Sequence, residues 1–499
     1  AASDVYKRQA LILGLIVTKK FNFDEWEFND RKYTFILVLI SLVCSLFLIL
    51  PHYSYPWPIH ADEWWQAGIA KNLKENLSIN SHPYFFNYFF NLKPALGVIT
   101  GIVEKFKIDI LENWYIFVFL NNFFIFFIIS TLIRNYVGNF SLLLPVILTS
   151  LKSNAYFLGW WFFIPSTFGL IYFWPSILIN DDNFKNTKIL KIIFLITLTL
   201  IYPPYAFLIL FIFLIDYLIK SFFQRKFLFL IFFLFLIILF LVFSSYSPYQ
   251  AYFEKKNIFG AILVPVKATT HFVELVNIFD VVPVIIFLLG AVAFFINFPN
   301  YLKILFVFSV INLNIILLTK HSLFLFHQRH YQLLGILLSL GSLWVFNHFK
   351  YLIHNKLIKI LLMIVILILA FVNYDKIPYG TNIYYLIDEN NLPVLNWLKM
   401  QNSKKIVLAH PALGTVISPY SRLISPISLL SLQIINKNFN EELNFENLSC
   451  EEKRKVIERH GINLVIVLSK QNCQFLREVQ NINGYLIYEF NDSTIKSAN

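Results

Sequence analysis

Residues 33–50, YTFILVLISLVCSLFLIL, contain no charged side chain, and the acidic sequence His60-Ala61-Asp62-Glu63-Trp64-Trp65 follows shortly after them. The apolar stretch is long enough to cross the hydrocarbon core of a bilayer as a helix. A charged pair is costly inside that core and cheap at its surface. We therefore expect Tyr33–Leu50 to span a membrane and Asp62 and Glu63 to lie at its face, as a candidate functional site.

The composition of the whole chain points to a multi-pass membrane protein. Hydrophobic residues make up 58% of the chain and charged residues only 14%, which exceeds the apolar content of a soluble protein. Backbone polar groups in lipid must be paired within the protein, so the long apolar runs should be helices. We expect about eleven whole spans, which are Tyr33–Leu50, Trp114–Ile133, Phe140–Ser150, Phe157–Ile179, Ile192–Tyr202, Tyr205–Ile219, Phe227–Phe243, Val281–Phe298, Leu302–Leu318, Tyr331–Phe346 and Leu357–Val372.

Some of these spans are short, and the sequence leaves their form open. Phe140–Ser150 and the two runs that flank Pro203-Pro204 are consistent with tilted helices, re-entrant helices or one broken helix. At the N-terminus, residues 1–9 look like the translation of a sequencing adapter and are set aside. The apolar run Ala10–Val17 then reads as the remainder of a truncated membrane helix.

Basic residues predict the orientation. The net charge is +12, and cytoplasmic connections carry an excess of Lys and Arg. Lysines and arginines gather before the first span and in alternate short connections, at Lys19, Lys20, Arg31, Lys32, Lys185, Lys188, Lys191, Lys220, Arg225, Lys226, Lys350 and Lys356. The loops at Pro51–Asn113, Ser244–Asp280 and Lys320–His330 and the C-terminus should then be extracytoplasmic. No segment resembles a nucleic-acid-binding module.

The chain divides into a polytopic membrane domain, residues 10–374, whose first outer loop is 51–113, and a C-terminal domain, residues 375–499. Mixed charges replace the apolar runs there, and strands alternating with helices indicate a small α/β domain. The expected elements are a helix at Leu392–Met400, strands at Lys405–His410, Asn463–Leu468 and Tyr485–Glu489, and a helix that begins at the capping box Ser449–Glu452 and ends at His460-Gly461. Cys450 and Cys473 share this domain and are candidates for a disulfide.

A helix is also expected in the first outer loop. Trp65, Ile69 and Leu73 recur at helical spacing, which is typical of an amphipathic helix lying on a membrane surface, and Asp62 takes the position of its N-cap. The tryptophans at Trp64, Trp65, Trp160 and Trp161 are expected in aromatic belts at the membrane interface.

The motif from Ala61 to Leu73, ADEWWQAGIAKNL, with Asn91-Leu92-Lys93-Pro94-Ala95-Leu96-Gly97 after it, resembles the first outer loop of GT-C glycosyltransferases, in particular the protein-mannosyltransferase and aminoarabinose-transferase branch. That branch has a second proline where this chain has Ala95, and an Arg-Tyr pair late in the chain that Arg329-His330-Tyr331 matches loosely. The resemblance implies a GT-C fold and an inverting enzyme. It would move a sugar from a polyprenyl-phosphate donor to an unidentified glycan, lipid or protein acceptor, in the cell membrane of a bacterium or archaeon.

The resemblance also assigns roles to site residues. Asp62 would take the proton of the acceptor, although a plain N-cap is the alternative. Glu63 would join it in the catalytic pair, either orienting Asp62 or facing water. Lys93 and Arg329 would bind the lipid phosphate, against the alternatives of a snorkelling lysine and a membrane-edge anchor.

Metal dependence is open, and a divalent cation is one option. The branch often has a further carboxylate before the fourth span, but Lys152–Tyr156 contains none. Glu254, Glu274 or Asp280 could supply it, and His60 could join such a site. The histidines near Arg329, which are His321, His327 and His330, could bind a metal or phosphate, although their spacing matches no zinc pattern.

Two other functions compete with the transferase. A transporter or flippase for a lipid-linked or anionic solute predicts charges inside the spans and paired repeats, whereas the spans here are nearly free of charge. A membrane scaffold whose C-terminal domain binds a partner predicts that replacing Asp62 is harmless.

Overall fold

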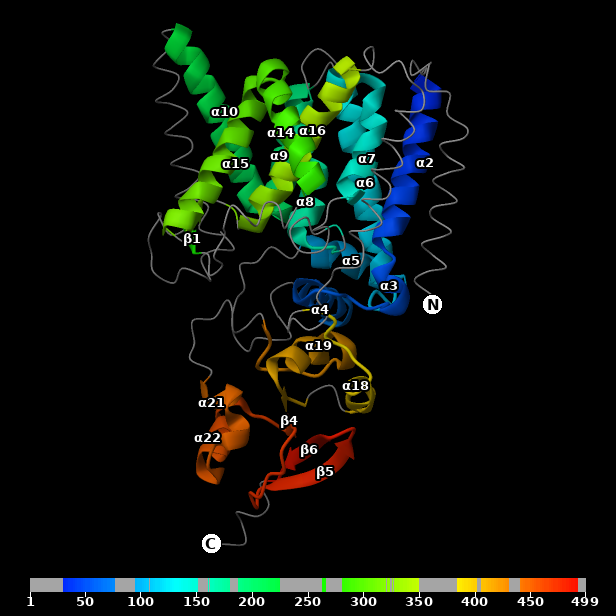
Figure 1. Cartoon of the computed structure of the whole chain (residues 1–499). Helices are drawn as coiled ribbons and strands as arrows, with labels where there is room; N and C mark the ends of the chain where they lie inside the picture. The colour runs from blue at the N-terminus through cyan, green and yellow to red at the C-terminus, as the bar shows by residue number, and fades with distance from the viewer. Residues whose placement is uncertain are drawn as a thin grey trace. The chain divides into compact units, whose positions relative to one another are not determined.

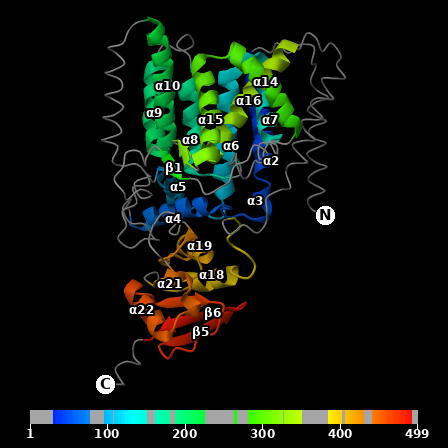
Figure 2. The same cartoon turned by 60° about the vertical axis from the view of Figure 1, so that its left-hand side comes forward.

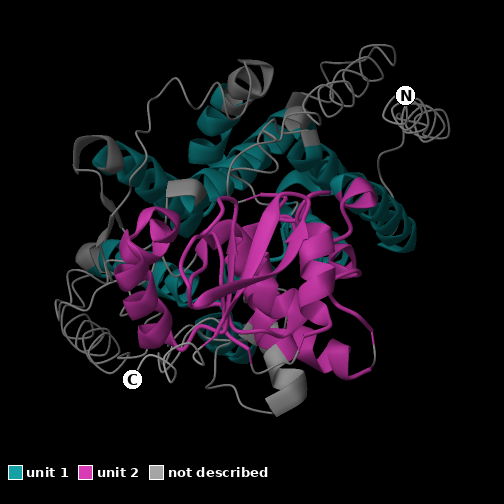
Figure 3. Ribbon diagram, turned by 90° about the horizontal axis from the view of Figure 1, so that it is seen from below, with its two compact units in different colours: residues 1–51, 117–245, 256–377 teal, residues 52–116, 246–255, 378–499 magenta. Residues whose placement is uncertain are grey.

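The structure, a computed structural model, describes residues 30–76, 95–106, 108–150, 160, 162–179, 187–224, 263–265, 281–319, 321–323, 325, 327–349, 384–401, 405–429 and 440–491. The chain forms two compact units, which Figure 3 colours separately. Unit 1 comprises residues 1–51, 117–245 and 256–377, and unit 2 comprises residues 52–116, 246–255 and 378–499. Residues 1–9 and the run Ala10–Val17, which was predicted to be part of a membrane helix, lie outside the described residues.

Unit 1 is a helical bundle, whose helices lie side by side in Figures 1 and 2. Its described elements are α2 (Asp30–Leu48), α6 (Trp114–Val137), which begins in unit 2, the 3-10 helix η1 (Gly138–Leu143), α7 (Leu144–Ser150), α8 (Pro165–Leu178), α9 (Thr187–Ile201), α10 (Pro203–Gln224), α14 (Val281–Asn297), α15 (Asn300–Thr319) and α16 (His327–Phe349). Strands β1 (Leu263–Pro265) and β2 (His321–Leu323) form an antiparallel pair.

Prolines and small residues explain where these helices begin and how closely they pack. Pro165 and Pro203 are the first residues of α8 and α10, where a missing N–H costs nothing. Thr167 closes the start of α8 by accepting from the Ile164 N–H and donating to the Phe162 carbonyl. A Cβ on Gly341 would collide with the carbonyl oxygen of Gly290, so α14 and α16 cross at a contact that only small residues permit.

Most of the predicted spans correspond to observed helices. Within the described residues, three helical stretches are long and apolar enough to cross a membrane, namely Asp30–Leu48, Trp114–Thr149 and Pro203–Ser221. The short run Phe140–Ser150 is η1 followed by α7, and the runs flanking Pro203 are the separate helices α9 and α10. Phe227–Phe243 and Leu357–Val372 lie outside the described residues, so the count of about eleven spans stays a prediction.

Unit 2 joins the first outer loop to the C-terminal part of the chain. The loop contributes α3 (Pro51–Ser54), α4 (Ala61–Asn76) and α5 (Ala95–Lys105). Helix α4 packs against α5 and against α19 (Pro411–Ser421) from the C-terminal part. The sequence-based division placed this loop in the membrane domain, whereas its contacts group it with residues 378–499.

The C-terminal part of unit 2 is a mixed four-stranded sheet with helices. Its strand order is β3-β4-β6-β5, formed by β3 (Val407–Leu408), β4 (Leu464–Val467), β5 (Leu476–Ile482) and β6 (Tyr485–Phe490). Strand β3 is parallel to β4, and the other neighbours are antiparallel. Helices α18 (Leu392–Lys399) and α19 lie between α4 and the sheet in Figures 1 and 2. The remaining described helices are α21 (Asn440–Leu443), η3 (Phe445–Asn447) and α22 (Cys450–His460).

The elements predicted for this part are observed, and β5, α19 and the short helices α21 and η3 were not predicted. Ser449 and Glu452 form the capping box of α22, which ends at Gly461 with φ 61°. Cys450 and Cys473 form a disulfide with a Cα–Cα distance of 5.5 Å. Strand β5 was missed because its residues are mostly polar and exposed, and α19 was missed because Pro411 and Pro419 interrupt its pattern.

Candidate functional site

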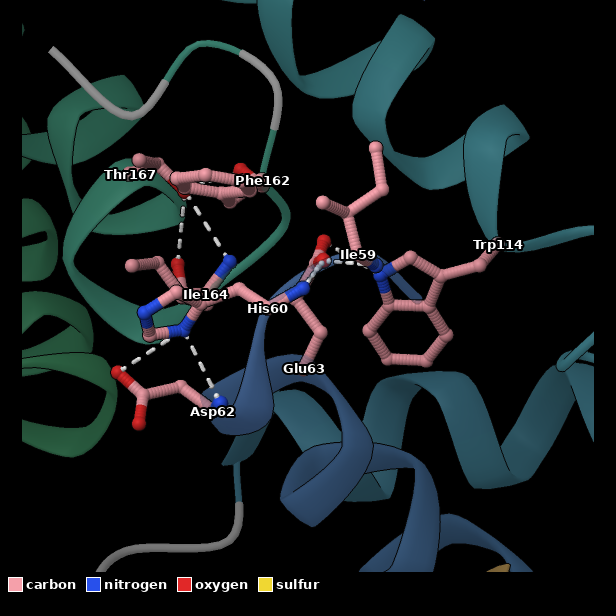
Figure 4. Close-up of polar contacts among 8 residues, drawn as sticks. All are labelled: Ile59, His60, Asp62, Glu63, Trp114, Phe162, Ile164 and Thr167. Atoms are coloured by element: carbon pink, nitrogen blue, oxygen red, sulfur yellow. Dashed lines mark hydrogen bonds and ion pairs between the residues drawn. The ribbon is translucent and has the colours of Figure 1, made fainter. Parts of the chain in front are cut away.

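The N-terminus of α4 is organised by His60 and Glu63 (Figure 4). The helix begins at Ala61, so His60 is its N-cap, and the His60 Nδ1 atom accepts the backbone N–H of Asp62 at 3.1 Å. The sequence-based placement of Asp62 at the N-cap is therefore wrong by two positions. Asp62 lies inside the first turn, and its carboxylate is not needed for capping.

Glu63 is fully buried, and three groups donate hydrogen bonds to its carboxylate. Oε2 accepts from the backbone N–H groups of Ile59 at 2.9 Å and His60 at 3.0 Å. Oε1 accepts from the indole Nε1–H of Trp114 at 2.7 Å, as Figure 4 shows. Burial excludes the alternative in which Glu63 faces water. Its carboxylate instead fixes the backbone before α4 and joins it to the start of α6.

Asp62 has the opposite environment. Its side chain is 38% exposed, and Oδ2 lies 3.6 Å from His60 Nδ1. Because that nitrogen accepts the Asp62 N–H, it carries no proton in the neutral ring, and the 3.6 Å contact is then not a hydrogen bond. The Asp62 carboxylate is thus an accessible anion on a fixed backbone.

A buried ion pair anchors α4 further along its length. Lys71 Nζ donates to Glu104 Oε1 at 2.7 Å and to Asp109 Oδ1 at 3.1 Å. The Glu104 side chain is only 2% exposed, and its other oxygen accepts the Ile110 N–H at 3.0 Å. These contacts hold α4, α5 and the connection to α6 together. No sequence motif predicted them.

The ion pair is reflected in the acidity of Asp109. Burial acts to raise the pKa of this carboxyl, but the Lys71 ammonium and the Leu111 N–H outweigh it and hold the pKa below its ordinary value. The folded loop therefore stabilises the carboxylate form of Asp109.

Residues 384–387 bind the segment that precedes α4. The Tyr385 N–H donates to the Ile59 carbonyl at 2.9 Å, and the Ile387 N–H donates to the Tyr55 hydroxyl at 3.0 Å. The rings of Tyr384 and His60 meet edge to face with centroids 5.1 Å apart. The C-terminal part of unit 2 therefore contacts the same histidine that caps α4.

In unit 1, Arg329 lies in the first turn of α16. Its Nε atom is buried and has no hydrogen-bond partner among the described residues. A cation at the N-terminal end of a helix opposes the helix dipole, and a buried unpaired N–H group is also unfavourable. Both costs fall when an anion binds, because helix N-termini and arginines are complementary to phosphate.

Two groups of buried polar contacts lie in the same bundle as Arg329. The His330 ring contacts the Asn312 amide and lies 3.5 Å from Ser309 Oγ, and the Tyr205 hydroxyl donates to Gln332 at 3.0 Å. All five side chains are buried. His330 is therefore a core histidine bound to polar neighbours from α15.

The described residues provide no set of ligands for the divalent cation that the sequence left as an option. No group of three or more His, Cys, Asp or Glu side chains that could hold a metal occurs in the described part of the chain. The side chains of His321 and His327, and the candidate carboxylates Glu254, Glu274 and Asp280, are not among those described. Lys93 also lies outside the described residues, so its assignment stays a prediction.

The predictions for the tryptophans and for the surface helix are wrong in part. Trp64, Trp65 and Trp160 are buried inside the protein, so the prediction of aromatic belts is wrong for these three, and Trp161 lies outside the described residues. Helix α4 itself is confirmed, but its described side chains from Glu63 to Ala70 are buried on every face. The protein covers this helix because α5 and α19 pack on it.

The chain has helices long and apolar enough to cross a membrane, and a unit with a mixed sheet, and its fold is similar to that of GT-C glycosyltransferases. One protein with this fold is the oligosaccharyltransferase of Archaeoglobus fulgidus. Its apo form matches with a TM-score of 0.57 and 11% identity, over 88% of this chain and 70% of that one. Its complex with zinc and sulfate matches with a TM-score of 0.57 and 12% identity, over 86% and 67%.

At this level of identity the likeness concerns the fold. It confirms the broader prediction of a GT-C fold, and the mannosyltransferase and aminoarabinose-transferase branch stays a prediction. No family model matches the sequence. No curated protein sequence matches it either.

Proposed function

We propose that the protein is a glycosyltransferase that moves a sugar from a polyprenyl-phosphate donor to an acceptor hydroxyl or amine at the extracytoplasmic face of the cell membrane. Unit 2 would lie on that face. The fold, the accessible carboxylate at α4 and the unpaired arginine nitrogen at α16 support this proposal. A fold alone does not specify a reaction, so the proposal rests on these two local arrangements.

Asp62 is the proposed general base. The observation that supports this role is that different side chains bind the backbone and remain exposed at the start of α4. His60 and Glu63 bind the backbone N–H groups there, and the Asp62 carboxylate stays exposed. A carboxylate held on a fixed backbone can accept a proton from a bound nucleophile. Glu63 takes the positioning role that was one of its two expected functions.

The reaction balances with these groups. The acceptor oxygen or nitrogen attacks the anomeric carbon and forms the new glycosidic bond, while its proton passes to Asp62. The bond between the anomeric carbon and the phosphate oxygen breaks, and its electron pair leaves with the lipid phosphate. Attack opposite the leaving group inverts the anomeric centre.

Arg329 and Lys93 are the proposed partners of the leaving phosphate. Charge accumulates on the phosphate oxygens as the bond breaks, so preorganised cations lower the barrier. The Arg329 Nε–H has no partner among the described residues, and a phosphate oxygen would complete its hydrogen bonding. The role proposed for Lys93 is supported by the resemblance of Lys93-Pro94 to the Lys-Pro motif of GT-C glycosyltransferases.

The proposal predicts that Arg329→Gln weakens use of the donor more than use of the acceptor. Removing one charged donor to the phosphate should lower kcat/KM for the lipid donor by roughly 10²–10³-fold. Arg329→Lys, which keeps the charge and loses the guanidinium fork, should retain part of that activity. Equal kinetics for wild-type and Arg329→Gln protein would remove Arg329 from the proposal.

The function itself is tested by reconstituting purified protein in proteoliposomes with polyprenyl-phosphate sugars and a mixture of glycan, lipid and peptide acceptors. Two products are measured, which are sugar on the acceptor and donor moved to the other leaflet. A transferase forms the first in wild-type protein but not in Asp62→Asn. Donor movement without transfer would favour the flippase. Glu112→Gln, an exposed carboxylate in the same loop, is the matched control and should remain active.

A further inference from the structure

Unit 2 contains a cavity of about 750 Å³ whose lining comes from the segment before α4, the segment 384–391, the start of α19 and the sheet. Its volume is in the range of sites for small organic ligands. The apolar floor includes Ile466 and Val467 of β4, and Tyr55, Tyr384, Tyr385 and Tyr485 also line the cavity. Nothing in the proposed reaction uses this cavity.

Four tyrosines are among the side chains that line the cavity. Tyr385 and Tyr485 are partly exposed, while Tyr55 packs edge to face on Tyr385 with centroids 5.0 Å apart. Partly exposed aromatic rings offer flat apolar surfaces, and their hydroxyls add polar contacts. The Tyr485 hydroxyl makes no hydrogen bond within the described residues. Burial and the nearby Asp388 raise the pKa of Tyr485, so it stays a hydrogen-bond donor at neutral pH.

The polar groups of the lining can both donate and accept. Asp388 Oδ1 accepts the N–H groups of Asn390 and Asn391, and the second oxygen of this exposed carboxylate is an acceptor for a ligand. His410 Nδ1 accepts the Ala412 N–H at 3.4 Å, so in the neutral ring the proton is on Nε2, which is a donor. This mixture suits a molecule that carries many hydroxyl groups.

Charge argues against an anionic ligand. The described lining contains the carboxylates of Asp388 and Glu446 and no lysine or arginine. The Glu446 carboxylate binds the N–H groups of Leu468 and Ser469 at 3.1 Å each, and so shapes the wall. A phosphate or a carboxylate-bearing ligand would meet only negative charge here.

The backbone of the lining is held in an unusual conformation next to α4. Tyr385 has φ 51°, a left-handed conformation that a tyrosine seldom adopts and that costs free energy. Its N–H is bound by the Ile59 carbonyl at 2.9 Å, directly before the N-cap His60. This hydrogen bond between Tyr385 and Ile59 therefore connects the aromatic wall of the cavity to the start of α4.

We propose that this cavity is a carbohydrate-binding site, in which a pyranose ring stacks on Tyr385 and Tyr485 and its hydroxyls bind Asp388 and His410. The apolar face of a sugar ring matches the aromatic surfaces, and its hydroxyl edge matches the mixed donors and acceptors. This inference rests on the proposed function. It assigns the acceptor of the sugar to the class of glycans, and unit 2 would hold that glycan during transfer.

The site is tested by saturation-transfer NMR and calorimetry on full-length protein in nanodiscs. The probes are methyl glycosides of glucose, mannose, galactose and N-acetylglucosamine, and short glucan and N-acetylglucosamine oligomers. At least one glycoside should bind. Tyr485→Phe and Asp388→Asn should each weaken binding by roughly 3- to 10-fold, the effect of one lost hydrogen bond. Leu468→Trp should abolish binding, because Leu468 lines the cavity and is 66% exposed, so the larger ring fills the mouth without entering the core.

Two controls test whether the glycosides bind in this cavity and whether the cavity rejects negative charge. Tyr420→Phe removes a hydroxyl outside the cavity lining and should leave binding unchanged. Glucose 6-phosphate should bind more weakly than glucose. The inference is overturned if no glycoside binds, or if choline or a peptide binds in the cavity and the glycosides do not. It is also overturned if the Leu468→Trp protein binds glycosides as well as the wild-type protein does.

The same protein distinguishes this inference from the proposed function. Asp62→Asn should lose transfer and keep glycoside binding. Asp62-dependent transfer without any glycoside binding would refute the carbohydrate site alone. Glycoside binding with transfer that does not depend on Asp62 would refute the proposed base and leave the site in place.

Discussion

At the scale of single residues, two neighbouring carboxylates have opposite environments. Glu63 is buried and accepts hydrogen bonds from Ile59, His60 and Trp114, while the Asp62 side chain is 38% exposed. The sequence located the pair but could not assign the roles, because Trp114 lies 51 residues from Glu63. In this protein the distant donor Trp114 binds Glu63, which makes Glu63 the structural member of the pair.

The buried role of Glu63 predicts a loss of stability in Glu63→Gln. An amide has one acceptor oxygen, and its NH₂ group faces N–H donors, so buried donors lose their partner. The free energy of unfolding should fall by roughly 1–3 kcal/mol. Urea denaturation in detergent measures it, with the exposed Glu441→Gln as the control. Unchanged stability in Glu63→Gln would contradict the positioning role.

At the scale of elements, α4 is held by contacts that no local pattern contains. Lys71, Glu104 and Asp109 join α4, α5 and the following loop, and residues 384–387 bind the segment before α4. Helical spacing predicted α4 correctly. The prediction that one face would lie on the membrane failed because α5 and α19 cover this helix, and helical spacing within α4 carries no information about such contacts.

The ion pair at Asp109 predicts a pH dependence for the folded loop. Because the pKa of Asp109 is lowered in the folded protein, the carboxylate stabilises the fold at pH values above the ordinary aspartate pKa of about 3.9. This stabilisation is lost as the pH falls through the lower folded value. Hydrogen exchange of residues 95–106 and 108–113 should accelerate on acidification more than exchange in the sheet. Asp109→Asn should remove that difference, and an identical pH response in both proteins would contradict the assignment.

The disulfide between Cys450 and Cys473 predicts a large contribution to the stability of the sheet and α22. The bond closes a loop with a sequence separation of 23, for which the entropy model gives about 3 kcal/mol. Replacing both cysteines by alanine should lower the unfolding free energy of unit 2 by about that amount. Limited proteolysis across a urea series measures it. Cys44→Ala, which removes the free cysteine, is the control, and equal midpoints for all three proteins would contradict the prediction.

At the scale of the whole molecule, the sequence predicted the type of fold better than its organisation. Charge-free runs marked helices such as α2 and α14 because lipid tolerates no unpaired backbone, and the fold is similar to that of the Archaeoglobus fulgidus oligosaccharyltransferase. The grouping of residues 52–116 with 378–499 could not be predicted, since contacts over such separations leave no periodicity. For the same reason, the sequence could name Cys450 and Cys473 only as candidates for a disulfide.

The central claim is that the Asp62 carboxylate accepts the proton of the acceptor during sugar transfer. Single-turnover transfer from a polyprenyl-phosphate sugar tests it most directly, with wild-type protein and Asp62→Asn compared at saturating donor. The account predicts that the rate of Asp62→Asn falls by roughly 10²–10⁴-fold, while donor affinity stays unchanged. Equal single-turnover rates for the two proteins would contradict it.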